Sequence, residues 1–245
     1  MTPSTTHLIL IPAYNPGRLL ETSVTEALSR WSPVWVVVDG STDRSHEGMT
    51  ASAQAGLEVM VLPENQGKGA AVLTGAERAL ARGFTHALVM DSDGQHPSSL
   101  IAEFMAASAA DPGAVICGRP LFGPDAPLIR LAGRQLSIAL VRLETRAKGA
   151  ADPLFGFRVY PLRPLVDALG RTRGGRRYDF DPEVAVRLAW SGVRAVNLDA
   201  PCRYVPRGEG GVSHFHYLRD NLRMIAMHLR LLSDLALGKT RGPAA

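Results

Sequence analysis

The stretch Val89-Met-Asp-Ser-Asp-Gly-Gln-His96 joins an apolar segment to a cluster of polar side chains. Residues 87–90 read as a buried parallel strand, so Asp91 and Asp93 fall where a strand ends. Because alternate residues of an extended backbone point to the same side, Asp91, Asp93 and Gln95 can direct oxygen atoms at one point. Such a set of oxygens is what a hard divalent cation, Mg²⁺ or Mn²⁺, requires, so we expect a metal site here.

Two carboxylates alone hold such a cation weakly. The cation normally completes its shell with water and with phosphate oxygens of a substrate, so the expected ligand is a diphosphate. The alternative is a solvated turn with an aspartate cap, which is the commoner fate of an isolated Asp-x-Asp sequence. The rest of the chain decides between these two interpretations.

Composition bounds the class of protein. At 245 residues, 46% of them apolar, the chain fits one large domain or a domain with an appendage. The net charge of +4 is modest for a nucleic-acid-binding protein, so no nucleic-acid partner is expected. Residues 1–157 carry 12 basic and 15 acidic side chains, whereas residues 158–245 carry 15 and 8, a local excess of +7. That excess suits phosphate groups or an anionic membrane surface.

Cellular location is inferred from two further features. Cys117 and Cys202 form neither a metal-binding pattern nor a disulfide framework, which favours a reducing compartment. The N-terminal residues lack a secretory pattern, and no apolar run reaches the roughly 18 residues that a membrane-spanning helix needs. We therefore expect a cytoplasmic protein without a transmembrane helix.

Strand-like and helix-like segments alternate through the first half of the chain. The predicted strands are residues 7–11, 34–38, 57–62, 87–90 and 114–118. This order predicts an α/β fold with a mostly parallel sheet, whose ligands lie beyond the carboxyl ends of the strands. Polar loops follow four of these strands and should converge on one edge. We expect Asn15 and Asp43 to cap the helices that follow the first two strands, with Pro16 at the first helical position.

The second half is less regular. We predict a helix over 128–148, a strand over 155–160, a Gly/Arg loop over 170–177, a helix opened by Asp181-Pro-Glu183, strands over 193–198 and 202–205, and a helix over 215–237. The loop is read as solvated. We divide the chain into a domain over residues 1–213 and an amphipathic helix with a short tail over residues 214–245.

Four motifs occur in order along the first half: Ile11-Pro-Ala-Tyr-Asn15, Val38-Asp-Gly-Ser-Thr-Asp43, Asn65-Gln-Gly-Lys-Gly69 and Asp91-Ser-Asp-Gly-Gln-His96. Together they resemble glycosyltransferase family 2, and within it the dolichyl-phosphate mannosyltransferase and polyprenyl-phosphate glycosyltransferase branch. The resemblance spans about residues 7–215. It implies a GT-A fold, a Rossmann-like sheet flanked by helices. It also implies a UDP- or GDP-sugar donor and a Mg²⁺ or Mn²⁺ cofactor.

The resemblance assigns roles to individual residues. It places the cation on Asp91, Asp93 and Gln95. It places the donor near Pro12, Tyr14, Asn15, Asp39, Gly40, Lys68 and Ser92. The residue types agree, because Tyr14 can stack on a base, Asp39 can accept from a ribose hydroxyl, and glycines 67 and 69 let backbone approach a phosphate. The alternatives are that Tyr14 packs, Asp39 shapes a turn and Lys68 is a surface lysine.

In the second half, Asp152-Pro-Leu-Phe-Gly-Phe-Arg158 resembles the branch's Asp…Ser-Gly-Phe-Arg signature, with Phe155 in place of a small polar residue. Arg119 and Arg134 lie near the branch's phosphate-binding arginines, and a guanidinium suits a lipid phosphate or the leaving diphosphate. The resemblance also places His214 near the diphosphate. The alternative for Asp152 and Arg158 is a structural ion pair.

These features predict an inverting, metal-dependent glycosyltransferase with Asp181, Asp93 and Arg134 as catalytic residues. If the acceptor is a lipid phosphate such as polyprenyl phosphate, no base is needed. If it is a hydroxyl, Asp181 must take the proton, since Asp181 followed six residues later by Arg187 matches the family's base. The alternatives from other classes are a phosphohydrolase, with Asp91 as nucleophile and Asp93 as acid, and a non-catalytic nucleotide-sugar sensor.

The last predicted helix is amphipathic. Its apolar stripe consists of Leu218, Leu222, Ile225, Leu229, Leu232 and Ala236. Such a stripe packs on the domain's own core, pairs with a second copy in a homodimer, or lies in a membrane interface. We expect a peripheral protein on the inner face of the membrane, with this helix near the acceptor entrance. Truncation after Ser213 is expected to leave nucleotide binding intact and to impair transfer to lipid acceptors.

Overall fold

The computed structural model describes residues 2–51, 55–123, 128–172, 174–202 and 216–240. Within these residues the strands form one seven-stranded sheet in the order β3-β2-β1-β4-β6-β5-β7. Their bounds are β1 His7–Ala13, β2 Val34–Asp39, β3 Leu57–Leu62, β4 His86–Val89, β5 Val115–Phe122, β6 Arg158–Pro161 and β7 Ala195–Cys202. Strand β6 is antiparallel to both of its neighbours, and the other pairs are parallel. The predicted α/β fold with a mostly parallel sheet is confirmed.

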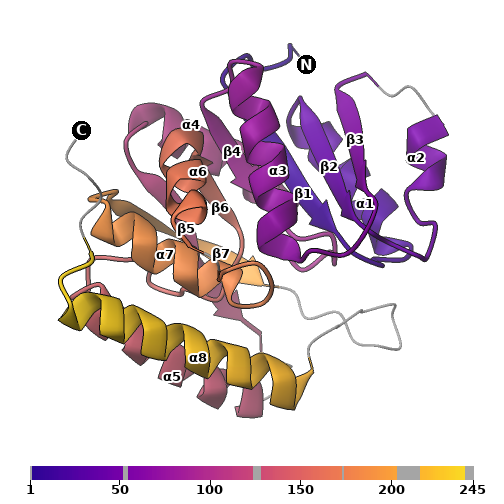
Figure 1. Cartoon of the computed structure of the whole chain (residues 1–245). Coiled ribbons are helices and arrows are strands. Elements are labelled where there is room, and N and C mark those ends of the chain that lie inside the picture. Colours follow the sequence, from indigo (N-terminus) through magenta and orange to yellow (C-terminus); the bar gives the residue numbers. More distant parts are fainter. Residues whose placement is uncertain (1, 52–54, 124–127, 173, 203–215, 241–245) are drawn as a thin grey trace.

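Helices cover both faces of this sheet (Figure 1). Their bounds are α1 Leu19–Arg30, α2 Glu47–Ala51, α3 Lys68–Ala81, the 3-10 helix η1 Ser98–Leu100, α4 Ile101–Ala110, α5 Leu128–Glu144, α6 Leu162–Gly170, α7 Phe180–Trp190 and α8 Tyr217–Ala236. On β1, Leu8 and Leu10 pack with α3, α6 and α7, whereas Ile9 and Ile11 pack with α1 and α4. Burial on both faces explains why the central strands are continuous apolar runs.

Helices α5 and α8 form a further layer against α7 (Figure 1). The three helices share a small apolar core made of Val141, Val186, Met227 and Leu231. Two polar contacts fix α8 in place: His228 Nδ1 lies 2.8 Å from Glu144 Oε1, and Arg230 Nη2 donates to Glu183 Oε2 at 2.5 Å. The predicted C-terminal helix is therefore present and packs on the domain. No helix in the described ranges is both long and apolar enough to cross a lipid bilayer.

The expected helix caps at Asn15 and Asp43 are wrong. Helix α1 begins at Leu19, and Asn15 has a φ of 45° in the loop before it. Asn15 Oδ1 accepts a hydrogen bond from Thr42 N at 2.7 Å, and Asp43 Oδ2 accepts one from Gly17 N at 2.8 Å. Because loop backbone groups far apart in the sequence take up both side chains, these residues join the loops after β1 and β2 instead of capping helices.

The second half also differs from expectation. The strand expected over 155–160 is the shorter and antiparallel β6. The strands expected over 193–198 and 202–205 are one strand, β7, up to Cys202, and residues 203–205 lie outside the described ranges. Helix α6 has no counterpart among the predicted elements. These differences arise where apolar runs are short, because a run of about four to eight residues suits a strand and a buried helical segment equally.

Candidate active site

The loop after β4 carries the predicted metal motif. Residues 92–94 form a turn in which Gly94 has a φ of 72° and Asp93 Oδ1 accepts a hydrogen bond from Gln95 N at 3.1 Å. The extended backbone expected from Asp91 to Gln95 is therefore wrong, because the aspartate satisfies a nearby backbone N–H and stabilises a turn. Both carboxylates nevertheless lie in one loop at the carboxyl end of the sheet, where ligands bind in such folds.

Lys68 joins this loop to a second aspartate. Its Nζ atom lies 2.7 Å from Asp91 Oδ1 and 2.7 Å from Asp181 Oδ2, and the three side chains are largely shielded from solvent. Lys68 is the first residue of α3 and Asp181 the second of α7, so two helix starts meet the end of β4. Burial alone would lower the pKa of Lys68, but the carboxylates of Asp181 and Asp91 raise it well above its usual range. Lys68 is therefore a charged member of the site and not a surface lysine.

The negative charge of Asp93 is less well compensated than that of Asp91. Burial, reinforced by the charge of Asp91, raises the pKa of Asp93 to about 7. Asp181 Oδ1 is buried and accepts no hydrogen bond. Within the described residues no three His, Cys, Asp or Glu side chains form a ready metal cluster. The carboxylates of Asp91 and Asp93, of which only Asp91 is paired with Lys68, still fit a cation that takes its remaining ligands from a substrate diphosphate and water.

His96 contacts the backbone of Asp91, a role that the sequence motif does not indicate. Its Nδ1 accepts a hydrogen bond from Asp91 N at 2.9 Å, and burial lowers its pKa to about 4, so the ring is neutral. A neutral ring that accepts at Nδ1 carries its hydrogen on Nε2, which lies 3.6 Å from Asp91 Oδ2. The ring packs edge-on against Phe155, with centroids 4.8 Å apart. The only sequence signal was its place at the end of the motif.

Asp39 and Gly40, predicted to contact the donor, brace the loop after β3. The two carboxylate oxygens of Asp39 accept hydrogen bonds from Gln66 N at 2.8 Å and Gly67 N at 2.7 Å. A Cβ atom on Gly40 would lie 2.4 Å from Asn65 N, so only glycine allows this approach. Asp39 therefore holds in place the loop that leads to Lys68.

The Gly/Arg loop packs on the same segment. Gly69 N donates to Arg176 O at 2.9 Å, and the guanidinium of Arg177 donates to Asn65 Oδ1 at 2.6 Å. A Cβ atom on Gly67 would lie 2.1 Å from Arg176 O, and a Cβ atom on Gly69 would lie 2.0 Å from Gly175 O. The two glycines therefore admit protein backbone here, where the sequence suggested a phosphate. Arg176 and Arg177 are half-buried, so the expectation of a solvated loop is wrong for them.

The sequence matches the model of the family described as "Glycosyl transferase family 2" over residues 8–168. The chain belongs to glycosyl transferase family 2. The resemblance carried by the four strand-end motifs is confirmed at the level of the family, and the chain is a glycosyltransferase. A comparison with curated proteins gave no significant match.

The structure of this glycosyltransferase is similar to those of S. aureus TarS residues 1–349. With the structure in complex with UDP-GlcNAc the TM-score is 0.57 at 16% identity, covering 91% of this chain and 66% of that chain. With the structure described without a ligand the TM-score is 0.54 at 16% identity, covering 92% and 71%. With the UDP complex it is 0.53 at 15% identity, covering 80% and 60%. This likeness shows the fold, which is the predicted GT-A type.

The signature that ends at Arg158 is held by buried contacts. Arg134 Nε donates to Asp152 Oδ2, and the ion pairs among the described residues do not include one between Asp152 and Arg158, which was the alternative interpretation of these two residues. Arg158 is completely buried and donates to Pro153 O at 2.7 Å and Asp181 O at 2.9 Å. The predicted contact of Arg158 with substrate does not fit this burial. Arg158 instead positions the start of α7, where Asp181 lies.

The other residues predicted for the site differ in burial. Pro12 is buried in β1, Tyr14 is half-buried just beyond it, and Ser92 is buried in the metal-motif turn. Arg119 is exposed and its Nε lies 2.5 Å from an oxygen of Asp199 on β7. His214 lies outside the described residues.

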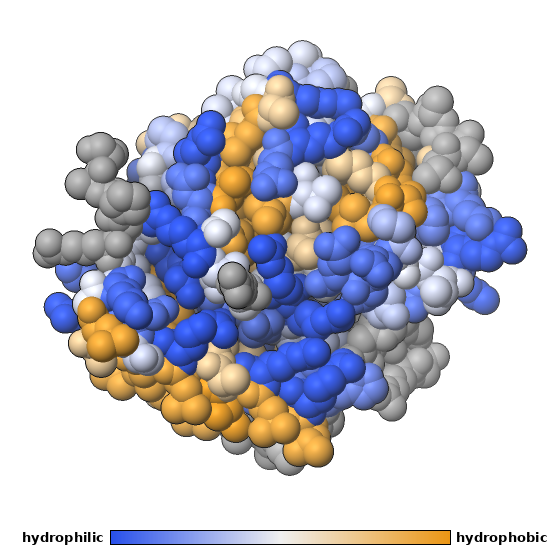
Figure 2. Space-filling model, in the orientation of Figure 1, coloured by the Kyte–Doolittle hydropathy of each residue, from blue (hydrophilic) through white to orange (hydrophobic). Residues whose placement is uncertain are grey.

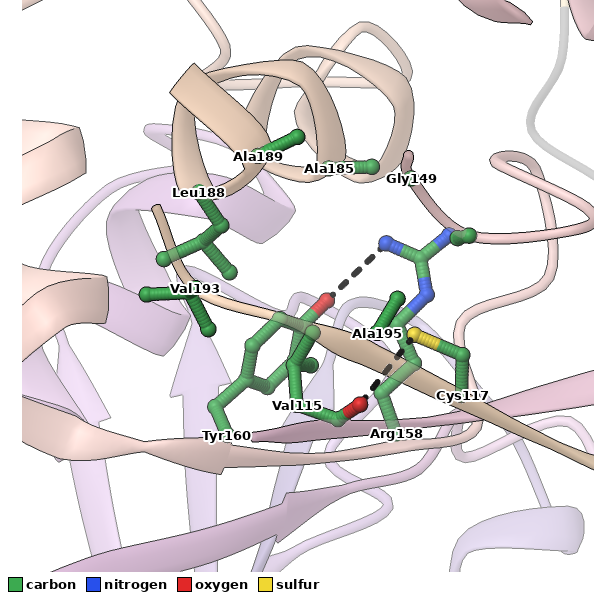
Figure 3. Close-up of a pocket in the computed structure, with 11 residues that line it drawn as sticks. Val115, Cys117, Gly149, Arg158, Tyr160, Ala185, Leu188, Ala189, Val193 and Ala195 are labelled. Carbon is green, nitrogen blue, oxygen red and sulfur yellow. Dashed lines mark hydrogen bonds between the residues drawn. The ribbon is translucent and has the colours of Figure 1, made fainter. Parts of the chain in front are cut away.

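A cavity beside Arg158 does not serve as a substrate site. Figure 3 shows Arg158, Tyr160 and Cys117 on its wall, with Arg158 Nη1 donating to Tyr160 Oη at 3.2 Å. Its volume of about 10 Å³ holds at most one water molecule. This cavity is therefore too small to hold a nucleotide-sugar.

Gly156 gives the first testable prediction. A Cβ atom there would lie 2.5 Å from Lys68 Nζ and 3.3 Å from both Asp91 Oδ2 and Asp181 Oδ1, so Gly156→Ala forces the ammonium group to move. Displacement of a positioned charge by about 1 Å costs on the order of a hundredfold in rate. We expect that loss in steady-state transfer assays, with an unchanged Tm.

The matched control is Gly113→Ala, because a Cβ atom at Gly113 would meet nothing within 4 Å. The control should keep full activity. If Gly156→Ala were equally active, the position of Lys68 would not matter for transfer.

Proposed function

We propose that this glycosyltransferase moves a sugar from a nucleoside-diphosphate sugar, a UDP- or GDP-sugar, to a lipid phosphate such as polyprenyl phosphate, with inversion at the anomeric carbon. The observation that carries the proposal is the meeting of Lys68, Asp91 and Asp181 beside Asp93. This arrangement combines a fixed positive charge with carboxylates at the open end of the sheet. A diphosphate with its cation has the complementary charges.

Asp91 and Asp93 would hold the Mg²⁺ or Mn²⁺, with Gln95 in the same turn as a third oxygen donor. When bound, such a cation neutralises the charge that develops on the leaving diphosphate. Lys68 supplies a second positive charge at the same place. His96 fixes the backbone of Asp91 through Nδ1, and its Nε2 lies 3.6 Å from the carboxylate. Arg134, whose Nε donates to Asp152 Oδ2, would add positive charge for a phosphate.

The donor class has separate support. The TarS structures named above are described as complexes with UDP-GlcNAc and with UDP, and they share the fold of this chain. A UDP-sugar is therefore the first donor to test. A thermal-shift panel of nucleotide-sugars with Mn²⁺ would identify it, because a ligand at a hundred times its Kd stabilises the folded state by about 2.7 kcal/mol.

A second acceptor class, a hydroxyl, is favoured by one observation. Asp181 Oδ1 is buried and without a hydrogen-bond partner, next to Lys68, so a proton acceptor is available. A lipid phosphate is already an anionic nucleophile and needs no such base. A hydroxyl acceptor would give its proton to Asp181, and general base catalysis contributes about 10²- to 10⁴-fold.

The substitution Asp181→Asn separates the two acceptors, because it keeps the size and removes the base. On polyprenyl phosphate we expect turnover within about tenfold of wild type, since one positioning contact to Lys68 is weakened while the nucleophile is unchanged. The assay is formation of the glycosyl phospholipid, followed by chromatography. A loss of a thousandfold or more would contradict transfer without a base and show that Asp181 is needed even with this acceptor. Transfer by the wild type to a hydroxyl acceptor but not to polyprenyl phosphate would contradict the lipid phosphate.

The same assay tests the two other classes. Incubation with a nucleotide-sugar, Mn²⁺ and acceptor should yield a glycosylated product. Release of phosphate from phosphomonoesters without sugar transfer would indicate a phosphohydrolase. Donor binding without turnover on any acceptor would indicate a nucleotide-sugar sensor. If the acceptor is a lipid, the protein works at a membrane surface, as a peripheral protein on its cytoplasmic side.

A further inference from the structure

Helices α5 and α8 expose an apolar surface. We define the α5–α8 face by six residues: Leu136, Leu143, Leu218, Leu222, Ile225 and Leu229. Each of them is between 56% and 78% exposed. Figure 2 shows an apolar band along the edge of the molecule where Figure 1 places α8. Apolar residues exposed singly are normal, but a row along two neighbouring helices marks an interaction surface.

The helices turn this surface away from the protein. At about 100° per residue, Leu136 and Leu143 lie opposite Val141 on α5, and the four α8 residues lie opposite Met227. Val141 and Met227 both point into the core shared with α7. The exposed rows therefore face outward from the same support. Because Arg230 and His228 tie α8 to buried carboxylates, the face belongs to a fixed helix and not to a loose tail.

The charges beside the face select its partner. The acidic side chains of α5 and α8 are turned inward: Glu144 and Asp220 are buried, and Asp234 is mostly shielded beside Arg187. Among the side chains that the structure describes on and just beyond these helices, the exposed charged ones are basic. They are Arg142, Arg146, Lys148 and Lys239, together with Arg219 and the partly exposed Arg223, which share the buried carboxylate of Asp220. An isologous dimer through this face would bring these basic groups together, whereas an anionic surface complements them.

We propose that the α5–α8 face docks on an anionic lipid surface. The leucines enter the boundary between headgroups and acyl chains, and the surrounding arginines and lysines contact lipid phosphates, as in other amphipathic helices that lie on membranes. The purpose of this docking, delivery of a lipid acceptor, rests on the proposed function. The docking itself does not depend on any turnover.

A series of side-chain and backbone contacts joins the α5–α8 face to the segment around Lys68. Arg230 on α8 donates to Glu183 on α7, whose Oε1 also accepts from Thr172 Oγ1 at 2.7 Å. Thr172 lies in the Gly/Arg loop, which packs on Gly67 and Gly69, the residues on either side of Lys68. If α8 docks on a membrane, these contacts fix the distance and orientation of that membrane relative to the strand ends where the donor is proposed to bind.

Co-sedimentation of the full chain with vesicles tests the proposal. Vesicles of phosphatidylcholine with about a third phosphatidylglycerol should bind the protein, vesicles of pure phosphatidylcholine should bind it much less, and added salt should weaken binding. The double variant Leu222→Glu with Leu229→Glu should lose at least about tenfold in affinity for the anionic vesicles, because two charges enter an apolar contact. The control Val61→Glu changes an exposed valine on edge strand β3 and should bind as wild type does.

Three results would overturn the docking proposal: unchanged binding by the double variant, equal binding to both vesicle types, or sedimentation as a dimer that the double variant converts to a monomer without any vesicle binding. Donor thermal shifts of each variant confirm that it is folded. Vesicle binding without formation of a glycosylated lipid would support the docking and contradict the proposed acceptor. The two proposals therefore fail by different measurements.

Discussion

Replacement of Asp91 by alanine is expected to lower the rate of sugar transfer by about a thousandfold or more and to leave the fold intact. Asp91 has two tasks, because it would hold the cation and its Oδ1 fixes the ammonium group of Lys68 at 2.7 Å. Loss of both leaves the charge of the leaving diphosphate poorly compensated. Asp93→Ala should cause a loss of similar size through the cation alone, because the ion pairs of Lys68 among the described residues are with Asp91 and Asp181 and not with Asp93.

The measurement is the initial rate with saturating donor, acceptor and Mn²⁺, together with thermal melting to confirm folding. Asp91→Asn keeps the shape and removes the charge, so it should lose nearly as much as alanine. The matched control is Asp111→Ala, which removes an aspartate from the exposed ion pair with Arg194. The control should transfer sugar normally. Near-normal turnover in Asp91→Ala or Asp93→Ala would remove the metal assignment.

The strand ends could be predicted because their pattern is local. Apolar runs followed by Asp39, Lys68 or Asp91 are visible in the sequence, and the carboxyl ends of parallel strands meet at one edge of a sheet. The fold class followed from the same alternation. The helix caps at Asn15 and Asp43 were wrong because a side chain that can cap a helix can equally bind a neighbouring loop, and local sequence does not distinguish these partners.

The contacts that complete the site could not be predicted, because they join distant segments. Lys68 and Asp181 are 113 residues apart, and their pairing depends on how α7 packs against α3. Burial of Arg158 gives no periodic signal, since its partners are mostly backbone carbonyls. The antiparallel direction of β6 is equally invisible in a strand of four residues.

The structure also changes what truncation after Ser213 should do. The sequence alone predicts that loss of the last helix spares nucleotide binding. Met227 and Leu231 of α8 are fully buried in the core shared with α5 and α7. His228 pairs with Glu144, and Arg230 pairs with Glu183, whose carboxylate also contacts the Gly/Arg loop. Removal of α8 would expose that core and leave two buried carboxylates short of a partner, so point substitutions are the better probe of lipid docking.

The carboxylate of Glu183 gives the largest expected change in stability. Glu183 is completely buried and accepts hydrogen bonds from Thr172 Oγ1 at 2.7 Å, Arg187 Nε at 2.9 Å and Arg230 Nη2 at 2.5 Å. It therefore links the loop before α7, α7 itself and α8. A Cβ atom on Gly174 would lie 2.8 Å from Glu183 Oε2, so the loop rests directly on this contact.

Glu183→Ala should lower the free energy of unfolding by about 3 kcal/mol, near the low end for removal of one member of a buried ion pair. The cost is not higher because the side chain of Arg230 is 39% exposed, so water can hydrate it after the substitution. A substantial cost remains because the side chain of Arg187 is only 13% exposed and loses its closest carboxylate. Urea denaturation followed by circular dichroism measures the change. The control Glu47→Ala removes an exposed carboxylate that pairs with Arg44 three residues away, and it should leave the midpoint unchanged. If Glu183→Ala also left the midpoint unchanged, the loop before α7, α7 and α8 would be held together by apolar packing alone.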